Sequence, residues 1–157
     1  MTVAHQGPTV VASDADAAAE WMRDHGHRVS AARRLVLEAL FAAPGPISAE
    51  QIADGLDGRL PVSDLTSVYR NLETLERLGL VRHFHAGHGA GMYALAREQE
   101  YVACSSCGEV RALEAESFDE VRKVIRRELG IAARFDHFPI VGLCAGCAKA
   151  SPTRVLQ

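Results

Sequence analysis

Four cysteines form two pairs, Cys104-Ser-Ser-Cys107 and Cys144-Ala-Gly-Cys147. Two C-x-x-C pairs can bring four thiolates to one point, which is the ligand set that tetrahedral Zn²⁺ takes in structural sites. Residues 108–143 separate the pairs, a longer gap than in a zinc ribbon, so a folded element must lie between them. Two redox dithiols or an iron site are the alternatives. A redox C-x-x-C needs no duplicate, so we expect structural zinc bound by all four cysteines.

Three of the seven histidines, His83, His85 and His88, lie within six residues. His83 and His85 are two residues apart, so on a strand they face the same side and can share a metal ion. His137 stands close to the second cysteine pair. Three imidazoles, completed by a carboxylate or water, suit Zn²⁺, Ni²⁺, Co²⁺ or Fe²⁺. An exposed polar strand is the plainer explanation of His83 and His85, and a solvated turn is the better explanation of His88.

Composition excludes several classes of protein. The chain of 157 residues is 48% apolar and 24% charged, which is typical of a globular protein and not of a disordered or collagen-like one. It has no apolar run of roughly 18 residues for a membrane helix. Its N-terminal segment lacks the pattern of a secretion signal, so a cytoplasmic location is expected. The net charge of −3 means that a nucleic-acid binder must concentrate its basic residues locally.

Capping signals and helical periodicity predict four helices in the first half of the chain. They are expected over residues 14–25 after a Ser13 or Asp14 cap, after a Ser30 cap, from the capping box Ser48-Ala-Glu-Gln51 through Leu56, and from a Ser63 cap to Gly79. Two strands, 80–85 and 91–95, follow as a hairpin. Helices followed by a hairpin are the order of a winged helix-turn-helix.

The rest of the chain predicts a small α/β unit. Strands are expected over 101–104, 109–113 and 138–143. The capping box Ser117-Phe-Asp-Glu120 opens a helix that carries Phe118, Val121, Ile125 and Leu129 on one face and ends at Gly130. The fold class is therefore α+β, with a boundary between its two parts near residues 96–100.

A helix-turn-helix places its second helix in the major groove of DNA. On the helix after Ser63, the exposed positions near the N-terminal end are Thr66, Ser67, Tyr69 and Arg70. These side chains can donate to phosphates and reach base edges, and Tyr69 can contact a thymine methyl group. Arg28, Arg33 and Arg34, at the head of the second helix, can bind the DNA backbone. Solvated surface is the alternative for Tyr69 and Arg70, and the adjacent wing favours DNA binding.

The chain resembles the ferric uptake regulator family of metal-responsive repressors. The matching segments run in family order over roughly residues 20–148, and they are Arg28-Val-Ser30-x-x-Arg33, Ser63-x-x-Thr66-Ser-Val-Tyr69-Arg70-x-Leu72, Leu78-Gly-Leu-Val81, Cys104-x-x-Cys107-Gly108, His137 and Gly142-Leu-Cys144-x-x-Cys147. The resemblance implies a homodimer that binds a palindromic DNA operator when metal is loaded. Its domains would be a flexible arm over 1–12, a winged-helix domain over 13–96, an α/β dimerisation and zinc-binding domain over 97–150 and a tail over 151–157.

The resemblance also assigns site residues. It places Tyr69 and Arg70 at the DNA contacts of the recognition helix, and Arg28 where a basic residue enters the minor groove. The four cysteines match the structural zinc site of many members. The H-x-H-x-x-H-G wing resembles the nickel-responsive branch, in which the counterparts of His83, His85 and His137 form one metal site.

The chain departs from the family where the main regulatory ligands are expected. Glu98-Gln-Glu-Tyr101 replaces a His-rich run. The histidine expected before the third helix is missing, and Pro46 and Ile47 stand in its neighbourhood. Ala112 replaces an acidic residue. Two hypotheses remain. Either sensing of zinc, nickel or iron has moved to His83, His85 and His137, with Glu100 or Glu98 as an oxygen ligand, or the protein answers haem, a small molecule or no signal. We favour the first, because the wing histidines are harder to explain otherwise.

Other functions are disfavoured. A zinc or thiol redox enzyme would need a catalytic motif, and the chain has no H-E-x-x-H, no G-x-S-x-G and no Gly-rich phosphate loop. A peroxide-sensing repressor with iron-catalysed histidine oxidation would lie within the family, but the missing His-rich run argues against it.

Overall fold

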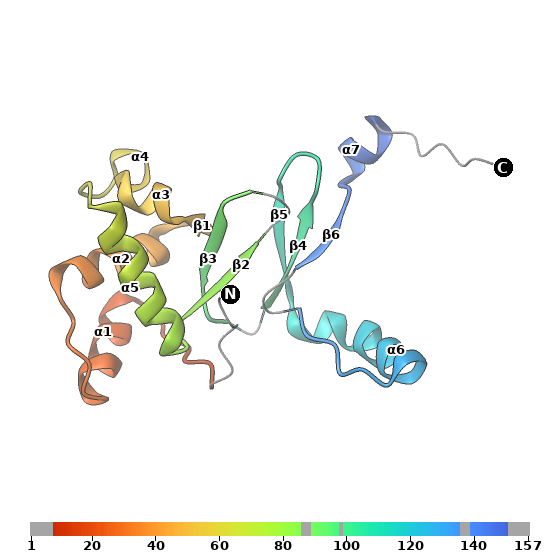
Figure 1. Ribbon diagram of the computed structural model, residues 1–157, viewed down its shortest axis with the longest axis horizontal. Helices are drawn as coiled ribbons and strands as arrows, with labels where there is room; N and C mark the ends of the chain where they lie inside the picture. Colours follow the sequence, from red (N-terminus) through yellow and green to blue (C-terminus); the bar gives the residue numbers. More distant parts are fainter. Residues whose placement is uncertain (1–7, 86–88, 98, 136–138, 151–157) are drawn as a thin grey trace. The chain divides into compact units, whose positions relative to one another are not determined.

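The computed structural model describes residues 8–85, 89–97, 99–135 and 139–150, which fall into two compact units. The first unit contains residues 8–84 and 90–97, and the second contains 85, 89, 99–135 and 139–150. Figure 1 shows the order of the elements along the chain. In the described segments, no helix combines the length and the apolar character needed to cross a membrane.

The first unit has the helical part of a winged helix-turn-helix. Its helices are α1 (Ala15–Asp24), α2 (Ala31–Ala42), α3 (Ala49–Ala53), α4 (Gly55–Gly58) and α5 (Leu65–Arg77). The predicted caps of the first three are confirmed. Asp14 accepts from the Ala17 amide, Ser30 accepts from the Arg33 amide, and Ser48 forms a reciprocal capping box with Gln51.

Two details of the predicted helices are wrong. The third helix ends at Ala53 rather than Leu56, because Gly55, Leu56 and Asp57 all adopt positive φ angles. The cap of α5 is Asp64, whose side chain accepts from the Ser67 amide at 2.8 Å, and not Ser63. In the described part of the chain, the buried Ser63 hydroxyl has no hydrogen-bond partner.

The core of the first unit forms where the apolar faces of its helices meet. Its largest fully buried side chains include Met22, Leu37, Ile52, Leu72 and Leu75. Each such burial contributes about 1.5–3 kcal/mol, so the core determines the packing of α5 against α2 and α3. Leu65, the first residue of α5, is exposed and does not join this core.

Three strands complete the first unit as its wing. They are β1 (Ile47–Ser48), β2 (Val81–His85) and β3 (Gly91–Leu95), in the spatial order β1-β3-β2. The predicted hairpin strands are confirmed, and the two-residue strand β1 was not predicted. β1 pairs antiparallel with β3, joining Ile47 to Tyr93 and Ser48 to Met92. The start of α3 is therefore attached to the wing.

The second unit is a three-stranded sheet with one long helix. Its strands are β4 (Gln99–Cys104), β5 (Val110–Glu114) and β6 (Ile140–Gly142), in the order β5-β4-β6. β5 is antiparallel to β4, whereas β6 is parallel to it. A parallel partner requires a long crossover, which the chain makes through η1 (Ala115–Phe118) and α6 (Asp119–Leu129). The short helix α7 (Ala145–Ala150) follows β6.

The helix α6 differs from expectation at its start. Phe118 stands at the N-cap with no side-chain hydrogen bond, so the predicted capping box at Ser117 is wrong, because the 3₁₀ turn η1 occupies these residues. Of the predicted apolar face, Phe118 is buried in the unit, but Val121 and Leu129 are exposed. No residue of α6 is buried within the described chain.

Candidate metal centre and nucleic-acid interface

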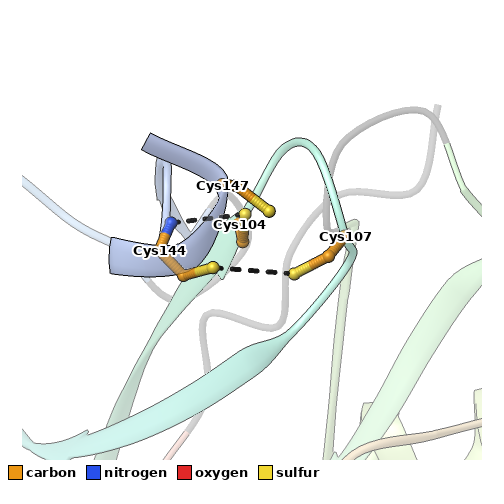
Figure 2. A group of neighbouring side chains, drawn as sticks. All are labelled: Cys104, Cys107, Cys144 and Cys147. Carbon is orange, nitrogen blue, oxygen red and sulfur yellow. Dashed lines mark hydrogen bonds between the residues drawn. The ribbon is translucent and has the colours of Figure 1, made fainter. Parts of the chain in front are cut away.

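The four cysteines meet at one end of the second unit. Cys104 ends β4 and Cys107 lies in the turn that follows, whereas Cys144 precedes α7 and Cys147 lies within it. Figure 2 shows the four sulfur atoms pointing toward a common centre. All four Sγ atoms lie within 4.8 Å of one another. The fold therefore brings together the two pairs that the sequence predicts to bind one zinc ion.

The sheet explains why the pairs meet. The parallel register places Cys104 beside Gly142, and the Ser105 amide donates to the Gly142 carbonyl at 2.9 Å. The first turn is closed by the Gly108 amide, which donates to the Cys104 carbonyl at 3.0 Å. The Cys144 amide donates to Cys104 Sγ at 3.4 Å, linking the second turn to the first. The crossover through α6 is the folded element expected between the pairs.

The sulfur spacing fits zinc and excludes a disulfide in this state. Cys107 Sγ and Cys144 Sγ are 3.9 Å apart, and all four cysteines are free. A tetrahedral ion with Zn–S bonds of about 2.3 Å places its sulfur ligands about 3.8 Å apart. Four thiolates complete the coordination, so a zinc ion there is structural and has no open position for a reacting water.

The thiols have unequal acidity. Backbone amides of Cys107, Cys144 and Ser106 donate to Cys104 Sγ and lower its pKa to about 6. For Cys107, the Glu109 amide acts to lower the pKa, but the neighbouring sulfurs and desolvation outweigh it and raise the pKa to about 11. The backbone thus favours the thiolate of Cys104, whereas a cation is needed to favour the thiolate of Cys107.

The wing histidines lie on β2, where His83 and His85 are both half-buried. The imidazole of His83 stacks on Tyr93 of β3, with ring centroids 4.6 Å apart and planes 8° from parallel. A side chain at Gly91 would clash with His83 Nε2, so glycine leaves room for this stack. Burial raises the pKa of Tyr93 to about 12, and the tyrosine is neutral at physiological pH. The stack orients the His83 ring.

The predicted regulatory metal site lies only partly within the described residues. His88, Glu98 and His137 lie outside the described residues. Within the described ranges, the four cysteines are the group of three or more candidate ligands close enough to share an ion. Glu100 is 8% exposed and binds Arg122 Nη2 of α6 at 2.6 Å. A metal ion at Glu100 would have to compete with this guanidinium.

The residues predicted to contact DNA lie at the N-terminal end of α5. Thr66, Tyr69 and Arg70 are exposed and Ser67 is half-buried, while Val68 and Leu72 face the core. The Tyr69 hydroxyl donates to Glu50 Oε1 of α3 at 2.8 Å. This end of α5 therefore presents hydroxyl, phenol and guanidinium groups outward on a helix whose opposite face is fixed by the core.

The three arginines near the start of α2 have different surroundings. Arg28 is exposed. Arg33 is partly buried, and its Nε donates to Asn71 Oδ1 of α5 at 3.1 Å. Arg34 pairs with Asp16 at 2.6 Å and Glu38 at 2.7 Å. Arg28 therefore remains a candidate for the DNA backbone, whereas Arg33 and Arg34 first serve contacts within the unit.

Sequence reasoning missed three polar residues that organise these sites. They are Glu50, which holds Tyr69, Asn71, which receives Arg33 and donates to the Ser67 carbonyl at 2.8 Å, and Arg122, which binds Glu100. Asn71 interrupts the apolar face of α5 and is 8% exposed. A polar residue at an inward helical position is the signal by which the sequence could have identified Asn71. Glu50 and Arg122 gave no such signal.

Comparison with known proteins identifies relatives that match most of the chain. Residues 24–137 match the model of FUR, the Ferric uptake regulator family. The Peroxide operon regulator of Bacillus subtilis (strain 168) is 26% identical over 133 residues, which cover 84% of this chain and 92% of that protein. This relative is a peroxide regulator, whereas the missing His-rich run of this chain argues against peroxide sensing.

Solved structures show the same fold. The Helicobacter pylori ferric uptake regulator Fur, described with three functional metal binding sites, has a TM-score of 0.66 at 16% identity and covers 88% of this chain and 93% of its own. A zinc uptake regulator complexed with zinc and DNA has a TM-score of 0.56 at 25% identity, with coverage of 87% and 93%. The winged helix-turn-helix and the α/β unit predicted from the sequence are thus confirmed as a fold.

Proposed function

Because the chain belongs to the ferric uptake regulator family, we propose that it is a homodimeric repressor that binds a DNA operator under the control of a metal ion. The family consists of metal-responsive transcriptional regulators and not of enzymes, and the four-cysteine cluster fits its structural zinc. The observation that carries the proposal is the gathering of four free thiols in one unit of a chain whose other unit presents a polar recognition helix.

Contact with DNA is assigned to the exposed end of α5. We infer that Thr66, Ser67, Tyr69 and Arg70 enter the major groove and that Arg28 contacts the adjacent backbone or minor groove. A helix of this position reads base edges with its N-terminal residues, while nearby donors bind phosphates. Support comes from the exposure of Tyr69 and Arg70 and from the zinc uptake regulator, which is of similar fold and is complexed with DNA.

Dimerisation is assigned to the second unit. The apolar residues Val121, Val124 and Leu129 of α6 are exposed in the single chain, and a second copy would cover them. A symmetric dimer would bind two half-sites, so the operator would be palindromic. A regulator that binds DNA operators works in the cytoplasm.

Regulation is assigned to His83, His85 and His137, with Glu100 or Glu98 as a further ligand and zinc, nickel or iron as the metal. Metal that binds the DNA-competent form more tightly shifts the population toward it, and a coupling of about 1–3 kcal/mol corresponds to roughly 5–150-fold in operator affinity. The relatives named above are peroxide, iron and zinc regulators, so nickel responsiveness stays a prediction.

A second proposal is supported by the Glu100–Arg122 ion pair. Glu100 is one of the two glutamates that stand where the His-rich run is expected. The guanidinium of Arg122 already binds its carboxylate at 2.6 Å. In this alternative the protein keeps the cysteine-bound zinc but does not sense a transition metal. It would then bind DNA constitutively or respond to haem or a small molecule.

One experiment distinguishes these proposals. Metal content and operator binding are measured on the same purified protein, before and after mild chelation, with graded return of zinc, nickel or iron. We expect about one zinc per chain to resist chelation and DNA binding to require a second, exchangeable metal. The variants His83→Ala and His137→Ala should then weaken operator binding while preserving the retained zinc, whereas His88→Ala serves as a matched wing control.

The outcomes are distinct. Binding that is unchanged with the retained zinc alone supports the alternative and removes the histidine site. If both histidine variants bind the operator like the parent when metal is present, the sensor assignment is wrong. If the protein selects no DNA sequence in any metal state, the proposal of a DNA-binding repressor fails as a whole.

A further inference from the structure

The phenol of Tyr69 is held by a carboxylate from another helix. Tyr69 is 42% exposed on α5, yet its hydroxyl donates to Glu50 Oε1 of α3 at 2.8 Å. Glu50 is nineteen residues away in the chain, so the contact depends on how α3 packs against α5 and not on spacing along one helix. Such a charge-assisted hydrogen bond selects one orientation of the hydroxyl.

The position of Glu50 is itself well determined. It follows Ala49, which is fully buried, and lies inside the capping box that joins Ser48 to Gln51. Ser48 also belongs to β1, which pairs with β3. The backbone that carries the carboxylate is therefore anchored to both the core and the wing. Glu50's own amide, the Tyr69 hydroxyl and Ser48 lower the pKa of Glu50, so its carboxyl is ionised at neutral pH.

This hydrogen bond limits what Tyr69 can offer to a base. A phenol has one O–H donor, and here the donor is already used by Glu50, so the oxygen can only accept. In the major groove, adenine presents an amino donor beside its N7 acceptor, cytosine presents an amino donor, and thymine presents a methyl group beside its O4 acceptor, whereas guanine presents only the two acceptors N7 and O6. An acceptor-only phenol beside an ionised carboxylate matches the first three bases and opposes guanine.

We propose that Glu50 is a positioning residue that makes Tyr69 select amino- or methyl-bearing base edges and reject guanine at the base pair it faces. The inference rests on the proposed function, because it requires α5 to enter the major groove. Glu50 acts through the orientation of the Tyr69 hydroxyl. Without Glu50, the hydroxyl is free to rotate and donate to guanine N7 or O6.

The test begins with the full-length, zinc-loaded protein. Operator sequences are selected from randomised DNA duplexes in the presence of zinc, nickel or iron, and affinities are then measured for the selected duplex and for versions with guanine at each position. In Glu50→Ala, we expect discrimination against guanine to fall about tenfold at one position of each half-site, the size of one base contact. Glu50→Gln retains an acceptor for the phenol and should recover most of the preference.

Two controls separate the hydroxyl from the charge. In a Tyr69→Phe background, Glu50→Ala should change guanine discrimination less than twofold, because no hydroxyl remains to be oriented. Glu20→Ala removes the same charge from an exposed site on α1 and should leave the base preference unchanged. Zinc content and thermal melting of each variant confirm that it is folded.

The inference is overturned if Glu50→Ala selects the same bases as the parent. It is also overturned if the loss of discrimination is as large in the Tyr69→Phe background, because the carboxylate would then act by its charge alone. In either case, selection of an operator by the parent protein would still support the proposed repressor function. A parent that selects no sequence in any metal state overturns both the function and this inference.

Discussion

The thiols of Cys104 and Cys107 differ in acidity although they belong to one cluster. Backbone donors lower the pKa of Cys104 to about 6, while the net effect of its surroundings raises the pKa of Cys107 to about 11. Neutral pH therefore leaves protons among the sulfur atoms until a cation displaces them. Zinc binding at this cluster is coupled to proton release, and its binding free energy stabilises the fold of the second unit.

Removing one sulfur should show this coupling. In Cys107→Ser, the cluster loses one of its four thiolates, and we expect the tightly held zinc to be lost and the melting temperature to fall by about 5 °C or more. Zinc stoichiometry and a thermal melt measure both effects. Ser105→Ala alters the same turn but leaves the four sulfurs in place, and it should keep its zinc. A Cys107→Ser protein that still retains one zinc per chain would contradict the four-cysteine site.

The buried Tyr93 predicts a loss of stability at alkaline pH. Its pKa is about 12 in the folded protein and near 10 in an unfolded chain. Between these values the unfolded state binds fewer protons, so the free energy of unfolding falls as pH rises from about 10 toward 12. The loss is of the order of 2 kcal/mol. Denaturant titrations of Tyr93→Phe and the parent at pH 9 and pH 11.5 should show a shallower decline in the variant.

Two features position α5, the proposed recognition helix. Arg33 of α2 donates to Asn71 of α5, which in turn donates to the Ser67 carbonyl, so a polar link crosses the interface between the helices. The turn after α3 also determines where α5 begins. In that turn the Leu60 amide donates to the Gly55 carbonyl at 2.9 Å, and the Ser63 amide donates to the Ala53 carbonyl at 2.9 Å.

Two glycines of this turn form a matched pair for mutation. Gly55 and Gly58 both have positive φ, of 74° and 80°. A Cβ at Gly55 would also collide with the Leu60 carbonyl, whereas a Cβ at Gly58 meets nothing within 4 Å. We expect Gly58→Ala to cost about 1 kcal/mol of unfolding free energy from backbone strain, and Gly55→Ala to cost about 3 kcal/mol or more. Equal losses in denaturant titrations would show that the collision is relieved.

The second unit exposes an apolar helix face. Val121, Val124 and Leu129 are 42%, 45% and 68% exposed, and no residue of α6 is buried in the described chain. Exposed apolar groups on one face of a helix are typical of an interface, and the family resemblance implies a dimer. In that dimer two recognition helices would engage one operator, and DNA affinity would depend on dimerisation.

A charge on α6 should therefore separate the subunits. In Val124→Glu, a carboxylate would have to be desolvated in the interface, and we expect the dimer to weaken at least tenfold. Sedimentation velocity measures the association, and operator affinity should decrease in parallel. Lys123→Gln changes a neighbouring exposed residue of the same helix and serves as the control. A dimer as strong as the parent would place the interface elsewhere.

Local sequence patterns determined much of this protein. Asp14, Ser30 and Ser48 cap helices as predicted because each cap bonds to an amide only three residues away. The hairpin strands and both C-x-x-C knuckles were predicted for the same reason, since short-range spacing defines them. The motifs also identified the family that the comparisons confirm.

Only the tertiary structure decided which polar residues meet across elements. Glu50 reaches Tyr69 and Arg33 reaches Asn71 because packed helices bring distant positions together, and Glu100 binds Arg122 rather than remaining open to a metal. The short strand β1 forms because β3 supplies its hydrogen bonds. These contacts depend on the relative placement of elements, which buried apolar side chains set jointly. A sequence pattern within one segment predicts the local hydrogen bonds of that segment. It does not predict the partners that folding brings to the segment from elsewhere in the chain.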